Sequence, residues 1–149
     1  MHGYFGIGVY HAKSECNIGT LMRTAYSYGA SFVYTVGKRY QRQASDTVNA
    51  MMKIPLYHFL TVDELVDHLP VACPLIGVEL VEGAQEVGNY THMPVACYLL
   101  GAEDHGIPAK DLARCHQVIV IPGAKTCLNV AVAGSIVLFD RYRQTRQAA

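Results

Sequence analysis

The sequence lacks the features that mark membrane and secreted proteins. None of its apolar runs approaches the roughly 20 residues that a helix needs to cross a bilayer. The opening stretch, MHGYFGIGVYHAKSE, has neither the basic start nor the small-residue cleavage site of a secretory signal peptide. We therefore expect a soluble protein of the cytoplasm.

Pairs of cysteines with metal-ligand spacing are also absent. The five cysteines are scattered, no two of them form a CxxC pair, and no cysteine–histidine group has the spacing of a zinc site. We expect most of them to be reduced, buried side chains, and we expect no metal site. Cys127 is different, because it lies close to Lys125 in a predicted loop, and a nearby cation lowers the pKa of a thiol.

An excess of charge of either sign is missing as well. Lysine and arginine together number 12, and so do aspartate and glutamate, whereas nucleic-acid-binding domains usually carry a basic surplus. Local clusters matter more than this total. Two basic clusters are present: Lys38, Arg39 and Arg42, and, near the C-terminus, Arg141, Arg143 and Arg146. Each cluster is either ordinary solvated surface or a contact for an anionic partner.

The chain shows short apolar runs that alternate with helical patterns. Runs with few polar breaks are typical of parallel strands buried on both faces. We expect strands at 3–10, 31–36, 73–80, 94–100 and 117–121. We expect helices at 17–29, 61–69, 108–115 and 128–144, with a short helix within 38–54. This alternation predicts an α/β fold with a mostly parallel sheet flanked by helices, and the absence of repeats and linkers predicts one domain over residues 1–149.

Local signals place the helix ends. Asn17 is a suitable N-cap for the first helix, and Thr61 is a suitable N-cap for the second, with Glu64 as its partner in a capping box. Pro108 is expected at the first position of the third helix. Gly134 and its small neighbours would let the last helix pack closely against another element.

Three loops follow predicted strands and carry unusual polar residues. They are HAKSECNIG, GAEDHGIP and PGAKTCLN, and each contains glycine. Ligands of parallel α/β sheets bind at the carboxyl ends of the strands, so these loops are the place to expect a site. Each polar residue also has a structural explanation: Asn17 as a cap, Arg23 as solvated surface and Glu103 as a charge near a helix N-terminus.

Taken in order, these loops resemble the three motifs of the SPOUT superfamily of RNA methyltransferases, in its 2′-O-ribose class, the SpoU or TrmH family. NIGTLMRTA is similar to motif 1, LLGAEDHGIP to motif 2, and IPGAKTCLNVAVAGSIVLFD to motif 3. The resemblance covers nearly the whole chain. It implies a C-terminal deep trefoil knot, bound S-adenosyl-L-methionine, and a homodimer in which two subunits form a composite active site. It also implies an RNA substrate: tRNA, with the anticodon wobble ribose as one target, or ribosomal RNA.

The resemblance also assigns residues by motif position. Its catalytic set falls on Asn17, Arg23, Glu103 and Asn129. Its cofactor-binding positions, largely backbone groups, fall on Val78, Glu79, Gly101, Ile121, Cys127 and Leu128. The substrate RNA would contact Lys38, Arg39 and Arg42, together with the C-terminal arginines. One departure matters, because Cys127 stands where the family often has serine, and cysteine is a weaker hydrogen-bond donor.

Two alternatives remain at this level. A non-catalytic RNA-binding module would keep the fold without the reaction, and the neutral net charge and Cys127 are compatible with it. A small-molecule enzyme that uses Cys127 as a nucleophile would not need S-adenosylmethionine. Within the methyltransferase interpretation, Arg23 is either the general base or a cation that stabilises the developing 2′-oxyanion.

Overall fold

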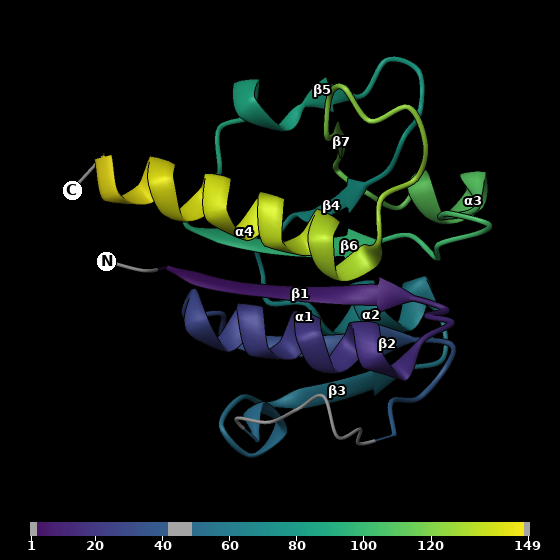
Figure 1. The fold of residues 1–149 in the computed structure, drawn as a ribbon, viewed down its shortest axis with the longest axis vertical. Helices are drawn as coiled ribbons and strands as arrows, with labels where there is room; N and C mark the ends of the chain where they lie inside the picture. Colours follow the sequence, from purple (N-terminus) through teal and green to yellow (C-terminus); the bar gives the residue numbers. More distant parts are fainter. Residues whose placement is uncertain (1–2, 42–48, 148–149) are drawn as a thin grey trace.

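The computed structural model describes residues 3–41 and 49–147. Within these ranges, strands of the order β3-β2-β1-β6-β4-β7-β5 form one sheet, and each neighbouring pair is parallel (Figure 1). The strands are β1 (Tyr4–Tyr10), β2 (Phe32–Val36), β3 (Leu56–Phe59), β4 (Leu75–Val78), β5 (Gln85–Glu86), β6 (Val95–Leu100) and β7 (Gln117–Val120). The predicted α/β fold with a parallel sheet is confirmed.

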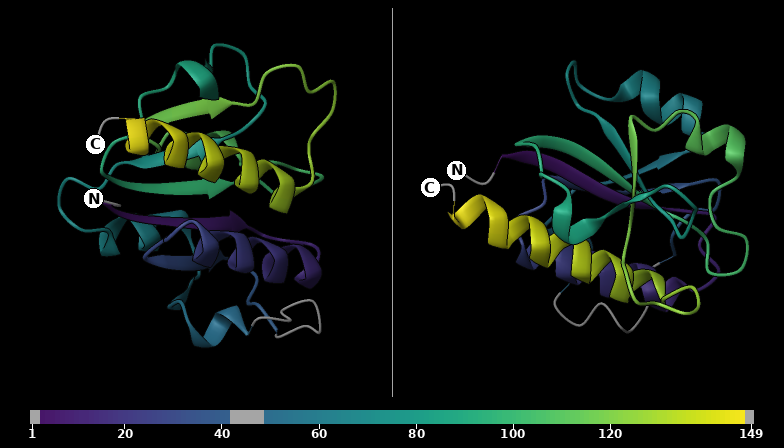
Figure 2. Two further views of the ribbon diagram at one scale, coloured as in Figure 1. Left: turned by 60° about the vertical axis from the view of Figure 1, so that its left-hand side comes forward. Right: turned by 90° about the horizontal axis from the view of Figure 1, so that it is seen from above.

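Helices cover both faces of this sheet. The helices are α1 (Glu15–Ser27), α2 (Val62–His68), α3 (Ala109–Leu112) and α4 (Val130–Gln147), with single 3₁₀ turns η1 (Ala50–Met52) and η2 (Val87–Asn89). Figures 1 and 2 show α1 and α4 side by side on one face, and α2 and α3 on the other. No helix among the described residues has both the length and the apolar character needed to cross a membrane.

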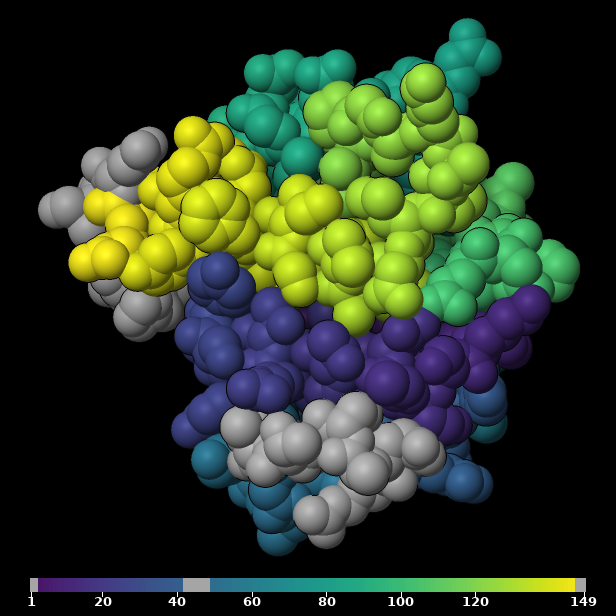
Figure 3. Space-filling model, viewed as in Figure 1, coloured from purple at the N-terminus to yellow at the C-terminus, as the bar shows by residue number. Residues whose placement is uncertain are grey.

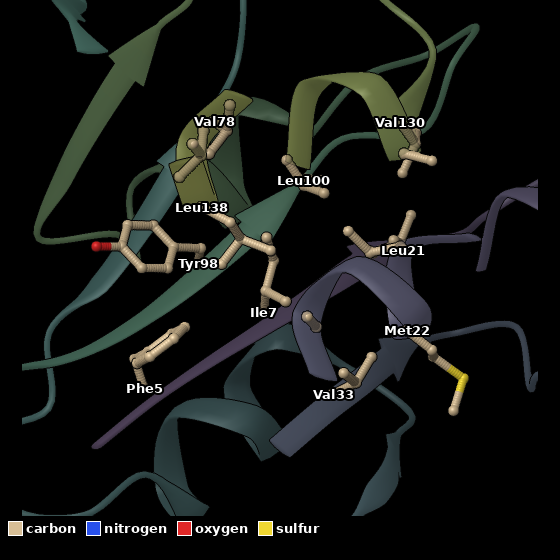
Figure 4. Close-up of a cluster of buried hydrophobic side chains, with 14 of the residues drawn as sticks. Phe5, Ile7, Leu21, Met22, Val33, Val78, Tyr98, Leu100, Val130 and Leu138 are labelled. Carbon is tan, nitrogen blue, oxygen red and sulfur yellow. The ribbon is translucent and has the colours of Figure 1, made fainter. Parts of the chain in front are cut away.

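The two faces of β6 illustrate why the buried strands contain almost no polar residues. Tyr98 and Leu100 point into the core under α1 and α4, while Cys97 and Leu99 point into the core under α2. Figure 4 shows the first of these cores, where Ile7 lies among side chains from α1, α4 and β6. A strand covered on both faces must be apolar at every position, and this is the pattern that identified β6 in the sequence.

Two strands were not predicted, β3 and β5. Strand β3 is at one edge of the sheet and none of its residues is fully buried, so its sequence LYHF mixes polar and aromatic side chains. Strand β5 is at the other edge and consists of Gln85 and Glu86 only. Edge strands need no continuous apolar run, so the pattern that found the central strands missed these.

The first helix begins earlier than predicted, so the assignment of Asn17 as its N-cap was wrong. Ser14 occupies the N-cap position with extended backbone, and Asn17 lies in the first turn. By contrast, Thr61 caps α2 as predicted, because its hydroxyl accepts a hydrogen bond from the Glu64 N–H at 3.1 Å. The Glu64 carboxylate accepts from the Leu60 N–H at 2.5 Å, one residue before the position that a capping box uses. The third helix begins at Ala109, so Pro108 is its N-cap and not its first helical residue, as had been predicted.

Glycine sets the approach of two elements to their neighbours. A Cβ atom on Gly134 would lie 2.4 Å from the Cδ1 atom of Leu21, so a side chain at position 134 would displace the Leu21 side chain where α4 packs against α1. In β1, a Cβ atom on Gly8 would lie 2.4 Å from the Tyr34 carbonyl oxygen and as close to its ring. Gly8 therefore makes room for the Tyr34 ring on β2.

Candidate functional site

The three loops singled out in the sequence meet at one edge of the sheet. They follow β1, β6 and β7, and the strand order keeps these three close together, with β4 lying between β6 and β7. Because all these strands are parallel, their carboxyl ends lie on the same side, where the loops gather (Figures 1 and 2). The topology therefore assembles polar residues that are more than a hundred positions apart in the chain, such as Asn17 and Asn129.

An open pocket of about 520 Å³ lies among the ends of β4, β6 and β7 and the start of α4. The six residues expected to hold the cofactor all line it: Val78, Glu79, Gly101, Ile121, Cys127 and Leu128. The rest of the lining is apolar apart from Thr126, so polar recognition in this pocket depends on backbone groups and on the side chains of Glu79 and Thr126.

A series of hydrogen bonds joins residues of all three loops beside the pocket. The Asn17 Nδ2 atom donates to the Glu103 carboxylate, and the Asn17 Oδ1 atom accepts from the Asn129 Nδ2 atom at 3.0 Å. The Asn129 Oδ1 atom accepts from the backbone N–H groups of Ala131 and Val132, at 2.9 and 3.3 Å, in the first turn of α4. The side chains of Glu103, Asn17 and Asn129 therefore fix the three loops and the start of α4 relative to one another.

Arg23 takes a different place from the other members of the expected catalytic set. It lies on α1 six residues beyond Asn17, which places it about 120° around the helix axis from Asn17. Its side chain is exposed. The structure thus brings Asn17, Glu103 and Asn129 together and directs Arg23 toward the protein surface.

A salt bridge makes a second link between the loops after β1 and β6. The Lys13 ammonium pairs with the Asp104 carboxylate at 2.5 Å, and the His105 ring lies 3.0 Å from the same carboxylate. The Lys13 ammonium lowers the pKa of the Asp104 carboxyl. Sequence reasoning missed this pair, because nothing in the two loops indicates which charges will face each other.

The residues expected to contact RNA are only partly placed. Lys38 is exposed, donates to the Lys13 carbonyl oxygen at 3.2 Å and lies 3.8 Å from the Glu15 carboxylate. Arg39 is also exposed. Arg42 lies outside the described residues. Lys38 and Arg39 thus sit on the surface next to the loop after β1.

The expectation that the C-terminal arginines form one RNA-binding cluster was wrong for Arg141. Its side chain is buried, with 2% of its surface exposed, and it donates to the carbonyl oxygens of Met93 and Pro94 at 2.5 and 2.9 Å. It also donates to the Tyr98 hydroxyl at 3.3 Å and lies over the Phe5 ring. A buried guanidinium needs such acceptors, so Arg141 holds α4 to the sheet, and its burial keeps it from contacting a partner.

Cys127 is exposed at the pocket. Among the described residues, no titratable side chain forms a hydrogen bond or an ion pair with its thiol. A cysteine nucleophile needs an adjacent base or cation, so the described geometry gives no support to the cysteine-dependent enzyme.

The chain matches the model of the SpoU rRNA Methylase family over residues 5–139. The tRNA (guanosine(18)-2′-O)-methyltransferase of Escherichia coli (strain K12) is 28% identical over 137 residues, which are 89% of this chain and 60% of that protein. The chain thus spans about three fifths of the length of this curated relative.

Solved structures share the fold. The SpoU methyltransferase AviRb from Streptomyces viridochromogenes, in complex with AdoMet, superposes with a TM-score of 0.87 at 20% identity, over 98% of this chain and 59% of that one. The A. aeolicus TrmH/SpoU tRNA modifying enzyme gives 0.86 at 20% identity, over 97% and 76%. A structure that concerns 2-OH methylation of C/U34 on tRNA gives 0.85 at 19% identity, over 99% of both chains.

Proposed function

The chain belongs to the SpoU rRNA Methylase family, and from this membership we propose that it transfers the methyl group of S-adenosylmethionine to a ribose 2′-hydroxyl of RNA. The observation that carries the proposal is the pocket at the ends of β4, β6 and β7, which lies beside the hydrogen-bonded side chains of Asn17, Glu103 and Asn129. The geometry of this site fits the family, and the three motifs in the sequence had predicted both.

The pocket suits the proposed cofactor. Its apolar walls, with Ile121 and Leu128 among them, fit an adenine ring, and the strand ends and loops around it offer backbone groups for hydrogen bonds. Gly101 lets the loop after β6 pack closely on Glu79 at the pocket. A Cβ atom at position 101 would lie 2.9 Å from the Gly106 Cα atom and 2.4 Å from the Glu79 carboxylate. When bound, S-adenosylmethionine supplies a methyl group already activated by its sulfonium.

The protein's own part in the reaction is chiefly to position the reacting groups. Asn17, Glu103 and Asn129 hold the loops that border the pocket. Arg23 is a poor general base, because a guanidinium stays protonated in proteins. We assign it instead to the stabilisation of the developing 2′-oxyanion or to the adjacent phosphate of the RNA, while solvent takes the proton.

The proposed substrate is tRNA, with ribosomal RNA as the alternative. The E. coli relative is named for position 18 of tRNA, and the solved structure that matches over 99% of both chains concerns C/U34 on tRNA. The match over nearly the whole of both chains favours tRNA as the substrate. The proposed RNA contacts are Lys38, Arg39 and Arg42. The proposed location is the cytoplasm.

The proposal includes a homodimer with a composite active site. Figure 3 shows α1 and α4 side by side on one exposed face, and the groove between them is lined by Asn17, Asn129 and several apolar side chains. Val132 and Phe139 on α4 are 49% and 53% exposed. Large apolar side chains beside catalytic candidates support an interface that brings Arg23 of one subunit to the pocket of the other.

A trefoil knot is part of the same proposal. Strand β7 inserts between β4 and β5, although β4 and β5 are consecutive in the chain. The segment after β5 then meets the far half of α4, where the His92 ring lies 3.1 Å from the Asp140 carboxylate and the Gln144 amide donates to the Tyr90 carbonyl oxygen at 2.9 Å. Contacts between this segment and the last helix support a chain that is threaded there.

Calorimetric titration with S-adenosylhomocysteine, the expected product, tests the proposal first. We expect saturable binding of about one ligand per chain, followed by methyl transfer from S-adenosylmethionine to tRNA transcripts that is lost when the target ribose is a 2′-deoxyribose. Transfer to ribosomal RNA alone would select the alternative substrate. RNA binding without cofactor binding and without transfer, by folded protein, would identify a non-catalytic module and overturn the proposal.

A further inference from the structure

Glu79 is the charged side chain of the pocket, and its carboxylate is already engaged by the protein. The Oε2 atom accepts a hydrogen bond from the Ile107 N–H at 2.8 Å, and the Oε1 atom accepts one from the Leu80 N–H at 2.9 Å. One carboxylate therefore joins the end of β4 to the far end of the loop that follows β6. The motif comparison assigned position 79 to backbone contacts with the cofactor, and it gave no role to this side chain.

The glycines of the same loop are matched to the carboxylate. A Cβ atom on Gly106 would lie 2.5 Å from the Glu79 Oε2 atom and 3.0 Å from its Cδ atom, and a Cβ atom on Gly101 would lie 2.4 Å from the same oxygen. Gly106 also has a φ of +60°, which side-chain-bearing residues rarely adopt. The loop thus packs closely on the carboxylate, and both glycines lie next to the same oxygen atom.

The loop that Glu79 holds also carries Glu103. Residues 101–107 close on themselves through the Gly106 N–H, which donates to the Ala102 carbonyl oxygen at 2.9 Å. Glu103 lies inside this turn and accepts the hydrogen bond from Asn17. A displacement of the turn would therefore move both one wall of the pocket and the acceptor for Asn17.

We infer that Glu79 is a positioning residue: its carboxylate packs against Gly101 and Gly106 and fixes the 101–107 turn. In this way it sets both the pocket wall and the place of Glu103. The inference rests on the proposed function only for the identity of the ligand. The geometry that carries it belongs to the protein itself. Glutamine can replace glutamate only in part. Its carbonyl oxygen can accept from one of the two N–H groups, but its amide NH₂ then faces the other N–H, and two donors cannot form a hydrogen bond.

The experiment compares wild-type protein with Glu79→Ala, Glu79→Gln and Glu82→Ala. Glu82 is an exposed carboxylate three residues further along the same connection, so its variant is the matched control. Amide hydrogen exchange is measured for peptides that cover 101–108 and, separately, for peptides from the central strands. Calorimetric titration with S-adenosylhomocysteine is carried out on the same preparations.

For Glu79→Ala we expect exchange in 101–108 at least about tenfold faster, with strands β1 and β6 unchanged, and affinity for S-adenosylhomocysteine at least about tenfold lower. Glu79→Gln should show both effects in weaker form, and Glu82→Ala should show neither. Unchanged exchange in 101–108, or faster exchange spread evenly over the sheet, would overturn the inference. If wild-type protein itself fails to bind S-adenosylhomocysteine, the proposed function fails, and the exchange measurement still decides the role of Glu79.

A double variant tests the packing against glycine separately. Gly106→Ala should accelerate exchange in 101–108 in the wild-type background, because its Cβ atom displaces the carboxylate. In the Glu79→Ala background, Gly106→Ala should add little to the rate of exchange in 101–108, apart from the effect of the strained positive φ at position 106. Fully additive effects of the two changes would mean that Gly106 and Glu79 act independently, which contradicts the inference.

Discussion

At the scale of single residues, Asn17 shows why a carboxamide is needed in the first loop. Its Nδ2 atom donates to a carboxylate, and its Oδ1 atom accepts from another amide. A carboxamide presents a donor and an acceptor on separate atoms without carrying a charge. A carboxylate at position 17 would meet the Glu103 carboxylate directly, and the two like charges would repel.

The first prediction follows from this pairing. Asn17→Asp should lower the rate of methyl transfer by about 100-fold or more, because repulsion from Glu103 displaces the loop that borders the pocket. The combined change Asn17→Asp with Glu103→Gln reverses the donor and the acceptor, and it should recover part of the loss. Single-turnover rates with tRNA measure both. A double variant no faster than Asn17→Asp would show that the hydrogen bond between these residues does not govern the rate.

The second prediction concerns the charge of Arg23. Arg23→Ala should lower the methyl-transfer rate by at least about 100-fold, whereas Arg23→Lys should retain about a tenth of the rate, since lysine keeps the cation that stabilises an oxyanion. Rates are compared at saturating S-adenosylmethionine, and affinity for S-adenosylhomocysteine serves as the control for an intact pocket. An inactive lysine variant that binds cofactor and RNA normally would count against the electrostatic role.

At the scale of elements, α4 is fixed at both ends by polar side chains. Asn129 holds the first turn of α4 through the Ala131 N–H. In the second half of the helix, Asp140 lies 3.1 Å from the His92 ring, which lies 2.6 Å from the Tyr98 hydroxyl on β6. Burial lowers the pKa of His92 below 6.5, despite the opposing effect of the Asp140 carboxylate, and burial raises the pKa of Tyr98. His92 is therefore neutral in the folded protein, with its Nε2–H donated to Asp140 and its Nδ1 atom accepting from Tyr98.

The third prediction is the resulting dependence of stability on pH. The unfolded chain takes up a proton on His92 near pH 6.5, and the folded protein does so only at lower pH, so the free energy of unfolding falls as the pH drops through 6.5 toward the folded pKa. His92→Gln keeps a donor and an acceptor but does not titrate, so its curve should be flatter over this interval. Urea unfolding at a series of pH values measures it, and parallel curves for both proteins would refute the assignment.

At the scale of the whole molecule, the separation of Arg23 from the other catalytic candidates decides what kind of active site is possible. Asn17, Glu103 and Asn129 are joined within one chain, while Arg23 is exposed on another side of α1. A site that needs all four residues is complete in one chain only if Arg23 turns back to its own pocket. It is complete in a dimer if α1 of one subunit faces the pocket of the other.

The fourth prediction distinguishes these arrangements. Arg23→Ala and Glu103→Ala should each be nearly inactive alone, but co-expressed or refolded together they should recover about a quarter of wild-type activity. Half of a random mixture of dimers contains one chain of each kind, and one of its two composite sites is then intact. No recovery, in mixtures shown by mass spectrometry to contain mixed dimers, would place Arg23 at its own subunit's pocket.

The sequence predicted most of the framework because its central strands and α1 have unambiguous patterns. Strands such as β6 are buried on both faces, so every residue is apolar and the pattern is continuous. The edge strands β3 and β5 face fewer neighbours, and their sequences carried no such signal. The same reasoning predicted where the loops meet, because parallel strands place their carboxyl ends on one side of the sheet.

What only the tertiary structure decided is how individual polar side chains pair. Arg141 resembled a surface arginine in the sequence, and it is buried against the carbonyl oxygens of Met93 and Pro94. The Glu79 carboxylate, similarly, is matched to glycines more than twenty positions away. Hydrophobic periodicity reports which face of an element is buried, and it is local, whereas a hydrogen bond depends on atoms that distant segments bring within about 3 Å of each other. The sequence by itself therefore determined the central elements and the edge of the sheet where the site lies, and the packing of the chain decided which residues work together there.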